Sequence, residues 1–444
     1  MIKQLPTSSH TLPPALIHRR QMPLPATVMA PPLLHIMLVT ETWLPDINGV
    51  ASSIYQLMRE LKKMGHRITL VRPRQSETTE QQMVANGANA AVVTTDLQVP
   101  SMKIPHYPHL RMGLPCYRFL RQKLRESRPD IVHIVTEGPL GLAALVAAKR
   151  QNIKVSSGYH TAFHDFSCYF GWKILSLPVL GYLKSFHNRC HATCVPSATT
   201  QRELQAIGFK KLHQVGRGVD TVRFSPTKRS QALRQSWGVG EGTTVLVCVS
   251  RVSPEKGIDT VIKSFKALQL QQLHRHVKLV VVGDGPYKAA LVKQFSQDDS
   301  IIFAGFQTGE ALATHYASAD AFVFASQVET FGNVVTEAMA SGLPVFAYHD
   351  AAAALLVNER CGSTVALGDE QTFIDRVAHL PKQQQLEQMR LESRHQVANL
   401  SWQVPAQDMI QMFYQVLVPA TITREDRVKY ASTKINHAIV SPQC

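Results

Sequence analysis

The stretch 326–344, S-Q-V-E-T-F-G-N-V-V-T-E-A-M-A-S-G-L-P, constrains the fold of this chain more than any other. It follows a short apolar run over 321–325, which is typical of a buried parallel strand. We expect a helix over 334–341 that ends at Gly342, and the next strand begins at Pro344. This order of strand, glycine-bearing turn, helix and strand predicts a parallel sheet covered by helices.

Two carboxylates lie in this unit, Glu329 in the turn and Glu337 on the helix, with seven residues between them. The free N–H groups at the start of a helix form an anion site. A carboxylate beside such a site is unexpected for a phosphate, so we expect another role for it. The obvious task is to accept hydrogen bonds from sugar hydroxyls. Either glutamate alone is more simply a capping or ion-paired residue, but the pair, with Gly332 and Asn333 between, favours a nucleotide-sugar site.

The alternation of apolar runs and helical segments occurs in two successive series, which predicts an α/β fold. Strands are expected over 34–39, 68–71, 130–135, 154–157 and 192–195, and again over 245–249, 278–282, 301–304, 321–325 and 345–347. A chain of 444 residues is too long for one ordinary core. The segment 214–220, which contains two glycines, is predicted to be the hinge between two domains.

We therefore expect an N-terminal domain over 33–213, a C-terminal domain over 214–405, and a helix over 406–425 that returns toward the N-terminal domain. Residues 1–32 are rich in proline, lack acidic residues and contain no apolar segment of the length a secretory signal requires. They are expected to be a disordered extension or the result of an over-long assigned start, and 426–444 is expected to be a tail.

The net charge of +15 indicates an anionic partner, either a phosphorylated substrate, an acidic membrane surface or nucleic acid. Because no zinc-finger or RNA-recognition signature is present, we expect no nucleic acid partner. No segment approaches the roughly 18 to 20 uninterrupted apolar residues of a transmembrane helix. The seven scattered cysteines are typical of a reduced cytoplasmic protein.

A helix expected over 114–126 carries Arg118, Arg121 and Arg125 beside an apolar stripe of Tyr117, Leu120 and Leu124. The pattern is typical of an interfacial helix that docks on anionic lipid. It is equally typical of a helix that packs its apolar stripe on the core and exposes a basic face to solvent.

Further candidate ligand residues follow predicted strands. Arg251 and Lys256 lie on one strand-to-helix turn, where a guanidinium and an ammonium favour a diphosphate. Gly49, at the entrance of the first helix, allows a phosphate or sugar to approach the backbone closely. His160 lies just past the strand 154–157, where parallel sheets hold their ligands, although a packed structural histidine is the alternative.

The turn with Arg251 and Lys256 and the unit with Glu329 and Glu337 together indicate a family. From about residue 35 to 402, the chain resembles the retaining glycosyltransferases of family 4. The resemblance rests on the ordered blocks P-D-I-N-G-V, R-P-D-I-V-H, T-E-G-P-L-G, Y-H-T-A-F-H, G-R-G-V-D, V-G-D-G-P, Y-A-S-A-D and E-T-F-G-N-V-V-T-E-A-M-A-S-G-L-P. Several blocks are similar to those of bacterial GDP-mannose-dependent α-mannosyltransferases and of glycolipid synthases, including sulfoquinovosyl-diacylglycerol synthase. The resemblance implies the GT-B architecture, in which two Rossmann-like domains with parallel sheets face each other across a central cleft.

The resemblance also implies a role for each candidate residue. Arg251 and Lys256 would hold the donor diphosphate, and Glu337 would bind the ribose hydroxyls. Glu329 would bind the transferred sugar, and His160 would contact that sugar from the opposite domain. The other donor-binding positions are Gly49, Gly283 and the backbone of Asn333 and Val334. Many relatives carry two adjacent glycines where this chain has Asn48 and Gly49, so the resemblance does not specify the backbone contact there.

No metal or other cofactor is expected, because fixed cations and helix-end N–H groups stabilise a leaving diphosphate by themselves. The sequence has no convincing Asp-x-Asp motif. A cluster of metal-ligand residue types occurs at His187, Cys190, His191 and Cys194, but a helix that runs into a strand explains it better than zinc. In the family, retention is explained by front-face attack with the leaving phosphate as base, so Glu329 is not assigned as a nucleophile.

These observations predict a hexosyltransferase that moves mannose from GDP-mannose to a lipid or lipid-linked acceptor with retention. It would be a cytoplasmic, peripheral membrane protein on the inner face of the plasma membrane. The alternative donor is a UDP-sugar, with transfer of a glucosyl, glucuronosyl or sulfoquinovosyl group to diacylglycerol. A remote alternative from another class is a non-catalytic sugar-nucleotide-binding partner protein, against which the intact basic and acidic site residues argue.

Overall fold

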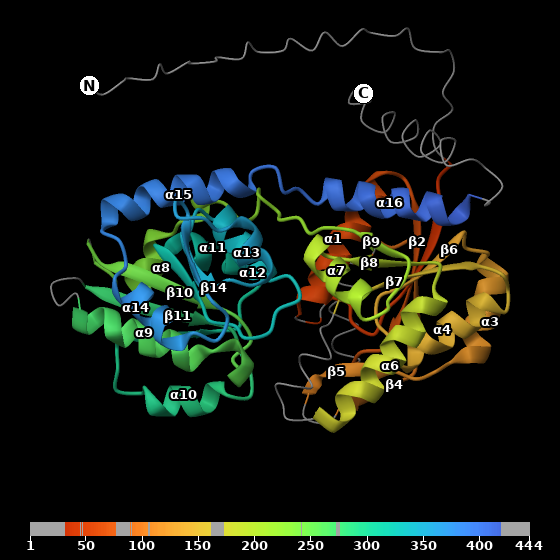
Figure 1. Cartoon of the computed structure of the whole chain (residues 1–444), viewed down its shortest axis with the longest axis horizontal. Helices are drawn as coiled ribbons and strands as arrows, with labels where there is room; N and C mark the ends of the chain where they lie inside the picture. The colour runs from red at the N-terminus through yellow and green to blue at the C-terminus, as the bar shows by residue number, and fades with distance from the viewer. Residues whose placement is uncertain are drawn as a thin grey trace, which may run out of the picture.

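In the computed structural model, two α/β lobes lie side by side (Figure 1). The structure describes residues 32–44, 46, 48–76, 89, 91–104, 107–160, 173–240, 242–271 and 276–418. The predicted extension, apart from its last residue, and the predicted tail over 426–444 lie outside these ranges.

The N-terminal lobe contains, within the described residues, a seven-stranded sheet whose neighbouring strands are all parallel. In spatial order the strands are β3 (Thr95–Val99), β2 (Arg67–Pro73), β1 (His35–Val39), β6 (Ile131–Ile134), β7 (Lys154–Gly158), β8 (Ala192–Val195) and β9 (Leu212–Gln214). The central strands β1 and β6 are buried along their whole length because helices cover both faces of the sheet. A separate antiparallel hairpin joins β4 (Ser101–Ile104) to β5 (Tyr107–Gly113).

The helices of this lobe divide between the two faces of the sheet. They are α1 (Gly49–Lys63), α3 (Tyr117–Ser127), α4 (Pro139–Lys149), α6 (Lys173–Arg189), α7 (Ala198–Ala206) and α16 (Gln403–Leu417). Side chains of α1 and α16 form one core with β1 and β2, whereas α3 and α4 pack on the opposite face. The last described helix of the chain therefore packs on the first lobe, and Figure 1 shows α16 there while its neighbour in sequence, α15, lies on the other lobe.

The C-terminal lobe contains a six-stranded parallel sheet in the described part of the chain. Its order is β12 (Ile301–Gly305), β11 (Val277–Val282), β10 (Thr244–Val249), β13 (Ala321–Phe324), β14 (Val345–Tyr348) and β15 (Gly362–Val365). The surrounding helices are η1 (Pro226–Lys228), α8 (Gln231–Ser236), η2 (Pro254–Lys256), α9 (Ile258–Gln271), α10 (Lys288–Gln294), α11 (Gly309–Ser318), α12 (Asn333–Ala340), α13 (Ala351–Leu356), α14 (Glu370–Ala378) and α15 (Gln383–Val397). Two parallel sheets with helices on both faces confirm the predicted α/β class and the pair of Rossmann-like domains.

Some predicted helix bounds differ from those observed. The basic helix expected from residue 114 begins at Tyr117, because Leu114 donates its N–H to the carbonyl of Pro100 (2.9 Å) and extends the hairpin. The last helix begins at Gln403, before the expected start at 406, and is described as far as Leu417. Within the described residues, no helix combines the length and the apolar character needed to cross a bilayer.

Candidate functional site

The turns that follow β10, β11 and β13 pack backbone against backbone at the carboxyl edge of the C-terminal sheet. A Cβ at Gly257, which has φ +63°, would lie 2.1 Å from the carbonyl oxygen of Ala325. A Cβ at Gly283 would lie 1.9 Å from the carbonyl oxygen of Ser250. Since neither position has room for a side chain, the two glycines allow these turns to converge. The N–H of Gly283 is donated to the carbonyl of Gly305 (2.8 Å). The role of Gly283 in this structure is therefore to allow close packing of the turns.

Lys256 and Glu329 form a partly buried ion pair at this edge. The Lys256 ammonium lies 2.6 Å from the Glu329 carboxylate, and it also donates to Ser326 Oγ (3.2 Å) and to the carbonyl of Val328 (3.0 Å). Ser326 donates its hydroxyl to the same Glu329 oxygen (3.0 Å). The residue predicted to hold phosphate and the residue predicted to hold sugar are therefore in direct contact.

Arg251 lies on the same turn and keeps its guanidinium partly exposed. Its Nη2 lies 2.9 Å from the carboxylate of Glu255, which is buried and also accepts the hydroxyl of Ser253 (2.6 Å). The buried carboxylate thus fixes one side of the guanidinium. The exposed fraction of the Arg251 side chain, 39%, leaves surface for an anion.

The N-terminus of α12 supplies the backbone donors of the site. Gly332 precedes the helix with φ +80°, and the N–H groups of Asn333 and Val334 belong to the first turn, where a helix has no acceptor of its own. One turn further on, the Glu337 carboxylate accepts the hydroxyl of Tyr316 (3.1 Å). Desolvation raises the pKa of Glu337 to about 7, so this carboxyl group changes charge near neutral pH.

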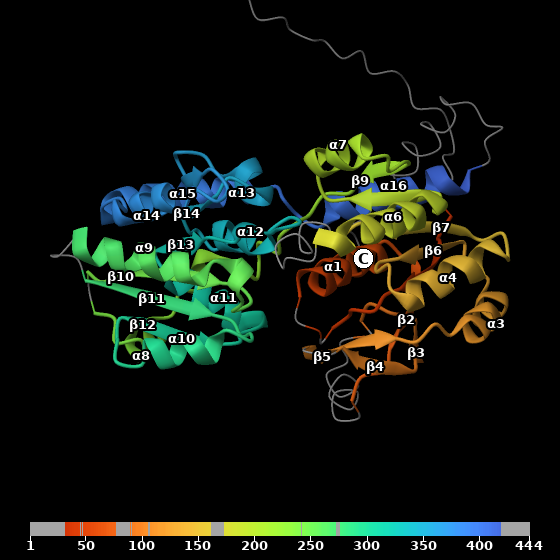
Figure 2. The same cartoon turned by 60° about the horizontal axis from the view of Figure 1, so that its bottom comes forward.

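The Asn333 side chain connects the two lobes. Its Nδ2 donates to the hydroxyl of Ser53 (2.8 Å) and to the carbonyl of Gly49 (3.3 Å), which lie one turn apart at the start of α1. The starts of α1 and α12 therefore face each other across the junction of the lobes, as Figures 1 and 2 show. Asn48 caps α1 by accepting the N–H of Ala51 (2.8 Å).

His160 lies at the carboxyl end of β7, as expected, but its ring is buried rather than open to solvent, with 6% exposed. Its Nδ1 lies 2.7 Å from Nη2 of Arg217, on the segment that joins the lobes. The ring lies over Gly158, where a Cβ would be 2.0 Å from Nε2. His164, in the same sequence block, lies outside the described residues.

Sequence analysis missed two acidic groups that follow β1 and β6. Glu41 accepts the N–H of Leu140 at the start of α4 (3.0 Å), and burial raises its pKa to about 7. Glu137 is buried and lies 3.0 Å from Nε2 of His187. The signal was present in the sequence, because both glutamates come within a few residues of a predicted strand end on the N-terminal side of the cleft.

The contacts of His187 also bear on the cluster of metal-ligand residue types at 187–194. Its Nδ1 lies 2.9 Å from Ser157 Oγ, so both ring nitrogens have protein partners. Within the ranges that the structure covers, no group of three or more histidine, cysteine or acidic residues is arranged to hold a metal ion. The cluster is built into the end of a helix and the following strand, as the sequence favoured.

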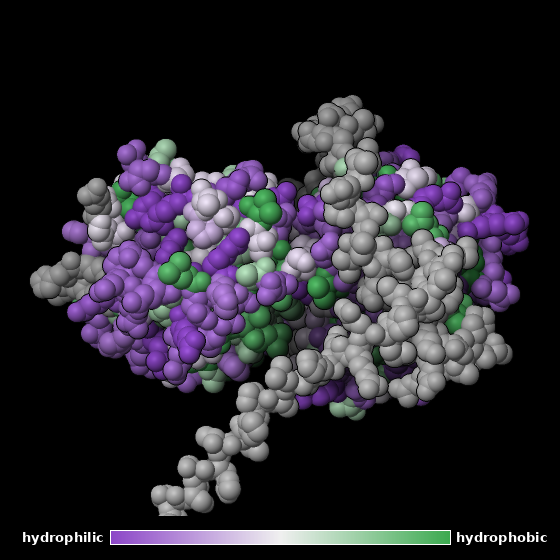
Figure 3. Space-filling view, turned by 90° about the horizontal axis from the view of Figure 1, so that it is seen from above, coloured by the Kyte–Doolittle hydropathy of each residue, from purple (hydrophilic) through white to green (hydrophobic). Residues whose placement is uncertain are grey.

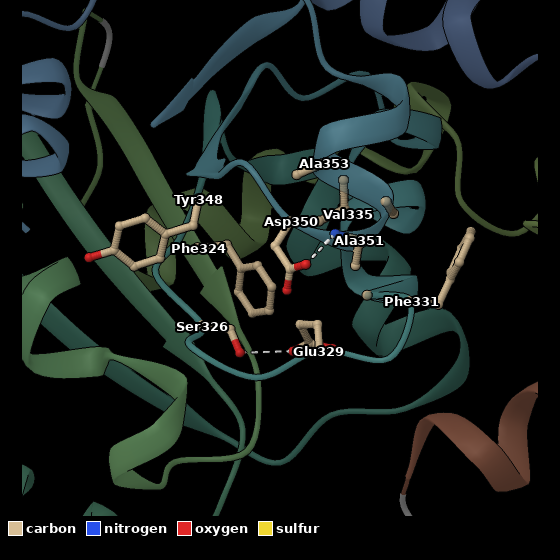
Figure 4. Close-up of a pocket in the computed structure, with 11 residues that line it drawn as sticks. Phe324, Ser326, Glu329, Phe331, Val335, Tyr348, Asp350, Ala351 and Ala353 are labelled. Carbon is tan, nitrogen blue, oxygen red and sulfur yellow. Dashed lines mark hydrogen bonds between the residues drawn. The ribbon is translucent and has the colours of Figure 1, made fainter. Parts of the chain in front are cut away.

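A small pocket lies beneath the Glu329 turn, between the ends of β13 and β14 and the start of α13. Figure 4 shows the carboxylates of Glu329 and Asp350 next to the ring of Phe324, with Phe331 directed away. Asp350 accepts the N–H of Ala351 (2.8 Å). Carboxylates beside an aromatic ring suit a hydroxylated ligand better than an anion.

The structure shows which side of the basic helix α3 packs against the protein. Leu120 and Leu124 are buried in the core, whereas Arg118, Arg121 and Arg125 are exposed. Of the two interpretations, the apolar stripe therefore fits a helix packed on the core, since that stripe packs against α4 and the sheet, and the exposed basic face remains available to solvent or an anionic surface. Figure 3 shows that hydrophilic residues also cover most of the C-terminal lobe on the face drawn there.

Comparison with known proteins gives two family matches in succession. The family described as Glycosyltransferase Family 4 matches residues 47–223, and the family described as Glycosyl transferases group 1 matches residues 229–398. The first match falls mainly on the N-terminal lobe, without β1 and α16, and the second falls on the C-terminal lobe.

Two curated relatives match most of the chain. It is 32% identical over 380 residues to a GDP-mannose-dependent alpha-mannosyltransferase of Mycobacterium tuberculosis, with 85% of this chain and 95% of the relative covered. It is 30% identical over 325 residues to an alpha-monoglucosyldiacylglycerol synthase of Streptococcus pneumoniae, with 71% of each chain covered.

Among solved structures, Anabaena Alr3699/HepE in complex with UDP and glucose matches with a TM-score of 0.67. The sequence identity is 18%, and the match covers 85% of this chain and 98% of that chain. This likeness confirms the two-lobed fold.

Proposed function

Since the chain belongs to glycosyltransferase family 4 and is a hexosyltransferase, we propose that it transfers mannose from GDP-mannose to a lipid or lipid-linked acceptor. The observation that carries the proposal is the contact between Lys256 and Glu329 beside the N-terminus of α12. The contact supports the proposal because the residue proposed to bind phosphate, the residue proposed to bind the sugar and the backbone donors of α12 lie close together. The identity to a GDP-mannose-dependent enzyme over most of the chain supports the donor.

The proposed reaction breaks the bond between the sugar carbon and the diphosphate oxygen, so positive charge develops on the sugar and negative charge on the diphosphate. Arg251, Lys256 and the N–H groups of Asn333 and Val334 stabilise the leaving diphosphate. Glu329 orients the sugar through its hydroxyls, and its contact with Lys256 holds the carboxylate in position. The acceptor hydroxyl forms the new bond from the same face and its proton passes to the departing phosphate oxygen, so configuration is retained.

Ligand-induced stabilisation tests the donor. A ligand at 100 times its dissociation constant stabilises the folded state by about 2.7 kcal/mol, so the true donor raises the melting temperature. We expect shifts with GDP and GDP-mannose but not with UDP or UDP-sugars. Glu337→Ala, which removes the proposed ribose contact, serves as the control and should show little shift. Shifts with UDP compounds alone contradict the GDP-mannose proposal.

The second candidate is transfer of a glucosyl group to diacylglycerol from a UDP-sugar. It is favoured by the 30% identity to an alpha-monoglucosyldiacylglycerol synthase. Both candidates use the same diphosphate and sugar contacts, so the same melting experiment separates them by the nucleotide base.

We further propose that the reaction uses no metal ion, because fixed cations already neutralise the diphosphate. Transfer by the enzyme after treatment with a chelator should equal that of the untreated enzyme. A rate that falls with the chelator and returns with a divalent cation contradicts this part of the proposal.

Attachment to an anionic membrane surface is proposed to be electrostatic, through the exposed arginines of α3. Each basic residue near such a surface contributes about 1 kcal/mol, so changing Arg118, Arg121 and Arg125 to Gln should weaken binding roughly 100-fold. Binding is measured by sedimentation with vesicles that contain anionic lipid and with neutral vesicles. The matched control changes Lys293, Arg360 and Lys382, three exposed basic residues of the other lobe, to Gln. Equal losses in both triple variants contradict a specific role for α3.

A further inference from the structure

His160 and Arg217 form an isolated pair between the lobes. The Arg217 guanidinium donates from Nη2 to Nδ1 of His160 at 2.7 Å. Among the described residues, Arg217 has no other hydrogen-bond partner. The pair is notable because the histidine follows β7 of the N-terminal sheet, whereas the arginine lies on the connection to the second lobe.

The chemistry of arginine fixes the direction of this hydrogen bond. A guanidinium carries five N–H donors and no acceptor. Burial lowers the pKa of Arg217 to about 10, which still leaves it charged at neutral pH. His160 Nδ1 must therefore accept with its lone pair, and a neutral ring then carries its proton on Nε2.

The surroundings of His160 keep its ring neutral. Burial holds the pKa of His160 well below its usual value, and the nearby Arg217 adds to the effect, followed by His133 and His187. Glu137, whose partner His187 lies near His160, is paired with that histidine and not with His160. A second proton on His160 would place two cations within hydrogen-bond distance of each other.

The Nε2 atom of His160 is buried and has no partner in the described part of the chain. A buried N–H without an acceptor is costly, and few such groups occur in folded proteins. His133 also has an unpartnered Nε2, but it lies within β6 under the ring of Phe413 (centroids 5.7 Å apart). His160 instead lies past the end of its strand, at the edge of the sheet where such folds bind ligands.

We propose that Arg217 is a positioning residue that fixes His160 as a hydrogen-bond donor, through Nε2–H, to an oxygen of the transferred sugar. The inference rests on the proposed function, because a hexose presents hydroxyl oxygens that accept such a bond. It also excludes His160 as a general base: Nε2 already holds a proton and the lone pair of Nδ1 is occupied by the guanidinium. Arg217 acts through His160 and touches no substrate atom in this scheme.

Nitrogen NMR of histidine-labelled protein tests the tautomer without any substrate, with the His160 signals assigned by comparison with His160→Gln. In the unaltered protein we expect a neutral ring with the proton on Nε2, unchanged between about pH 6 and 8. Arg217→Lys, which keeps a donor, should leave this tautomer in place. Arg217→Glu offers an acceptor, so it should move the proton to Nδ1 and allow the ring to titrate in this range.

Transfer kinetics provide the second readout. Because Arg217→Glu turns Nε2 from donor to acceptor, we expect kcat/KM to fall roughly 100-fold, while Arg217→Lys stays within about tenfold of the unaltered enzyme. Arg202→Glu, the same charge change on the exposed surface of α7, is the matched control and should have no effect.

A proton on Nδ1 in the unaltered protein overturns the proposal, as does an unchanged tautomer in Arg217→Glu. Transfer by Arg217→Glu at the rate of the Arg202→Glu control also overturns it. If the tautomers behave as expected but no nucleotide sugar is consumed, the proposed function fails while the assignment of Arg217 to His160 stands.

Discussion

At the scale of single residues, the environment of Glu337 bears most directly on the proposed binding of the donor. It is desolvated against Tyr316, and its pKa is raised to about 7. A carboxylate accepts hydrogen bonds at both oxygens, whereas a protonated carboxyl group must donate one and accepts more weakly. We therefore expect the ionised form of Glu337 to bind a ribose diol more tightly than the protonated form.

We predict that donor affinity decreases as the pH falls through 7. Since the raised pKa leaves Glu337 mostly protonated at pH 6 and mostly ionised at pH 8, the dissociation constant for GDP should rise about tenfold from pH 8 to pH 6. Glu337→Gln has no titrating group at this position, so it reports the titration of the ligand phosphates alone. Isothermal titration calorimetry measures both proteins. Parallel pH profiles would show that this carboxyl group does not control binding.

At the scale of single elements, the site depends on how closely the turns after neighbouring strands approach each other. The turn after β10 reaches the end of β13 because Gly257 has neither a Cβ nor a barrier to a positive φ. Lys256 is the preceding residue, so the same glycine positions its ammonium against Glu329.

Gly257→Ala should therefore destabilise the C-terminal lobe by about 2 kcal/mol or more, because backbone strain and a steric contact with Ala325 act together. Gly368→Ala is the matched control: Gly368 also has a positive φ, +84°, but a Cβ there meets nothing within 4 Å. We expect a clearly smaller loss of stability in the control, measured as the melting temperature. Gly257→Ala should in addition lose the stabilisation by GDP. Equal melting temperatures for the two variants would mean that the turns separate at little cost.

At the scale of the whole molecule, the two lobes meet where α1 and α12 begin. Two hydrogen bonds from Asn333 cross the junction at this point, and Arg59 lies 3.6 Å from Asp220 near the connecting segment. Because the first turn of α12 also carries the proposed diphosphate donors, we expect this contact to couple closure of the lobes to donor binding. Closure of this kind excludes water and limits hydrolysis of the donor.

Asn333→Ala should favour more open conformations, with a larger radius of gyration in small-angle X-ray scattering and more donor hydrolysis for each transfer event. Ser53→Ala removes the acceptor of the shorter of the two Asn333 hydrogen bonds. A variant with both the Asn333→Ala and Ser53→Ala changes should therefore differ little from Asn333→Ala alone. Such non-additivity is expected when two residues share one interaction. Ser52→Ala, on the exposed side of the same helix, is the control. Additive effects of the Asn333 and Ser53 changes would show that the bond between them does not hold the lobes together.

The sequence by itself determined the elements, the two-domain division of the sheets and the position of candidate groups at strand ends. Apolar runs bounded by glycine-bearing turns are local signals, so β10, β11 and β13 and the carboxyl-end positions of Lys256, Glu329 and His160 were predictable. The charge of α3 was also visible, but the sequence could not tell whether its apolar stripe packs on the core or belongs to an interfacial helix.

Only the tertiary structure decided which of these groups meet. Lys256 and Glu329 are 73 positions apart, and His160 and Arg217 are 57 positions apart, so no local pattern records either contact. The same is true of Asn333 and Ser53, which lie in different lobes. The pKa values of Glu41 and Glu337 also depend on how distant segments pack. Both values are raised by burial, and burial is set by the groups that surround a side chain in space and not by its neighbours in sequence.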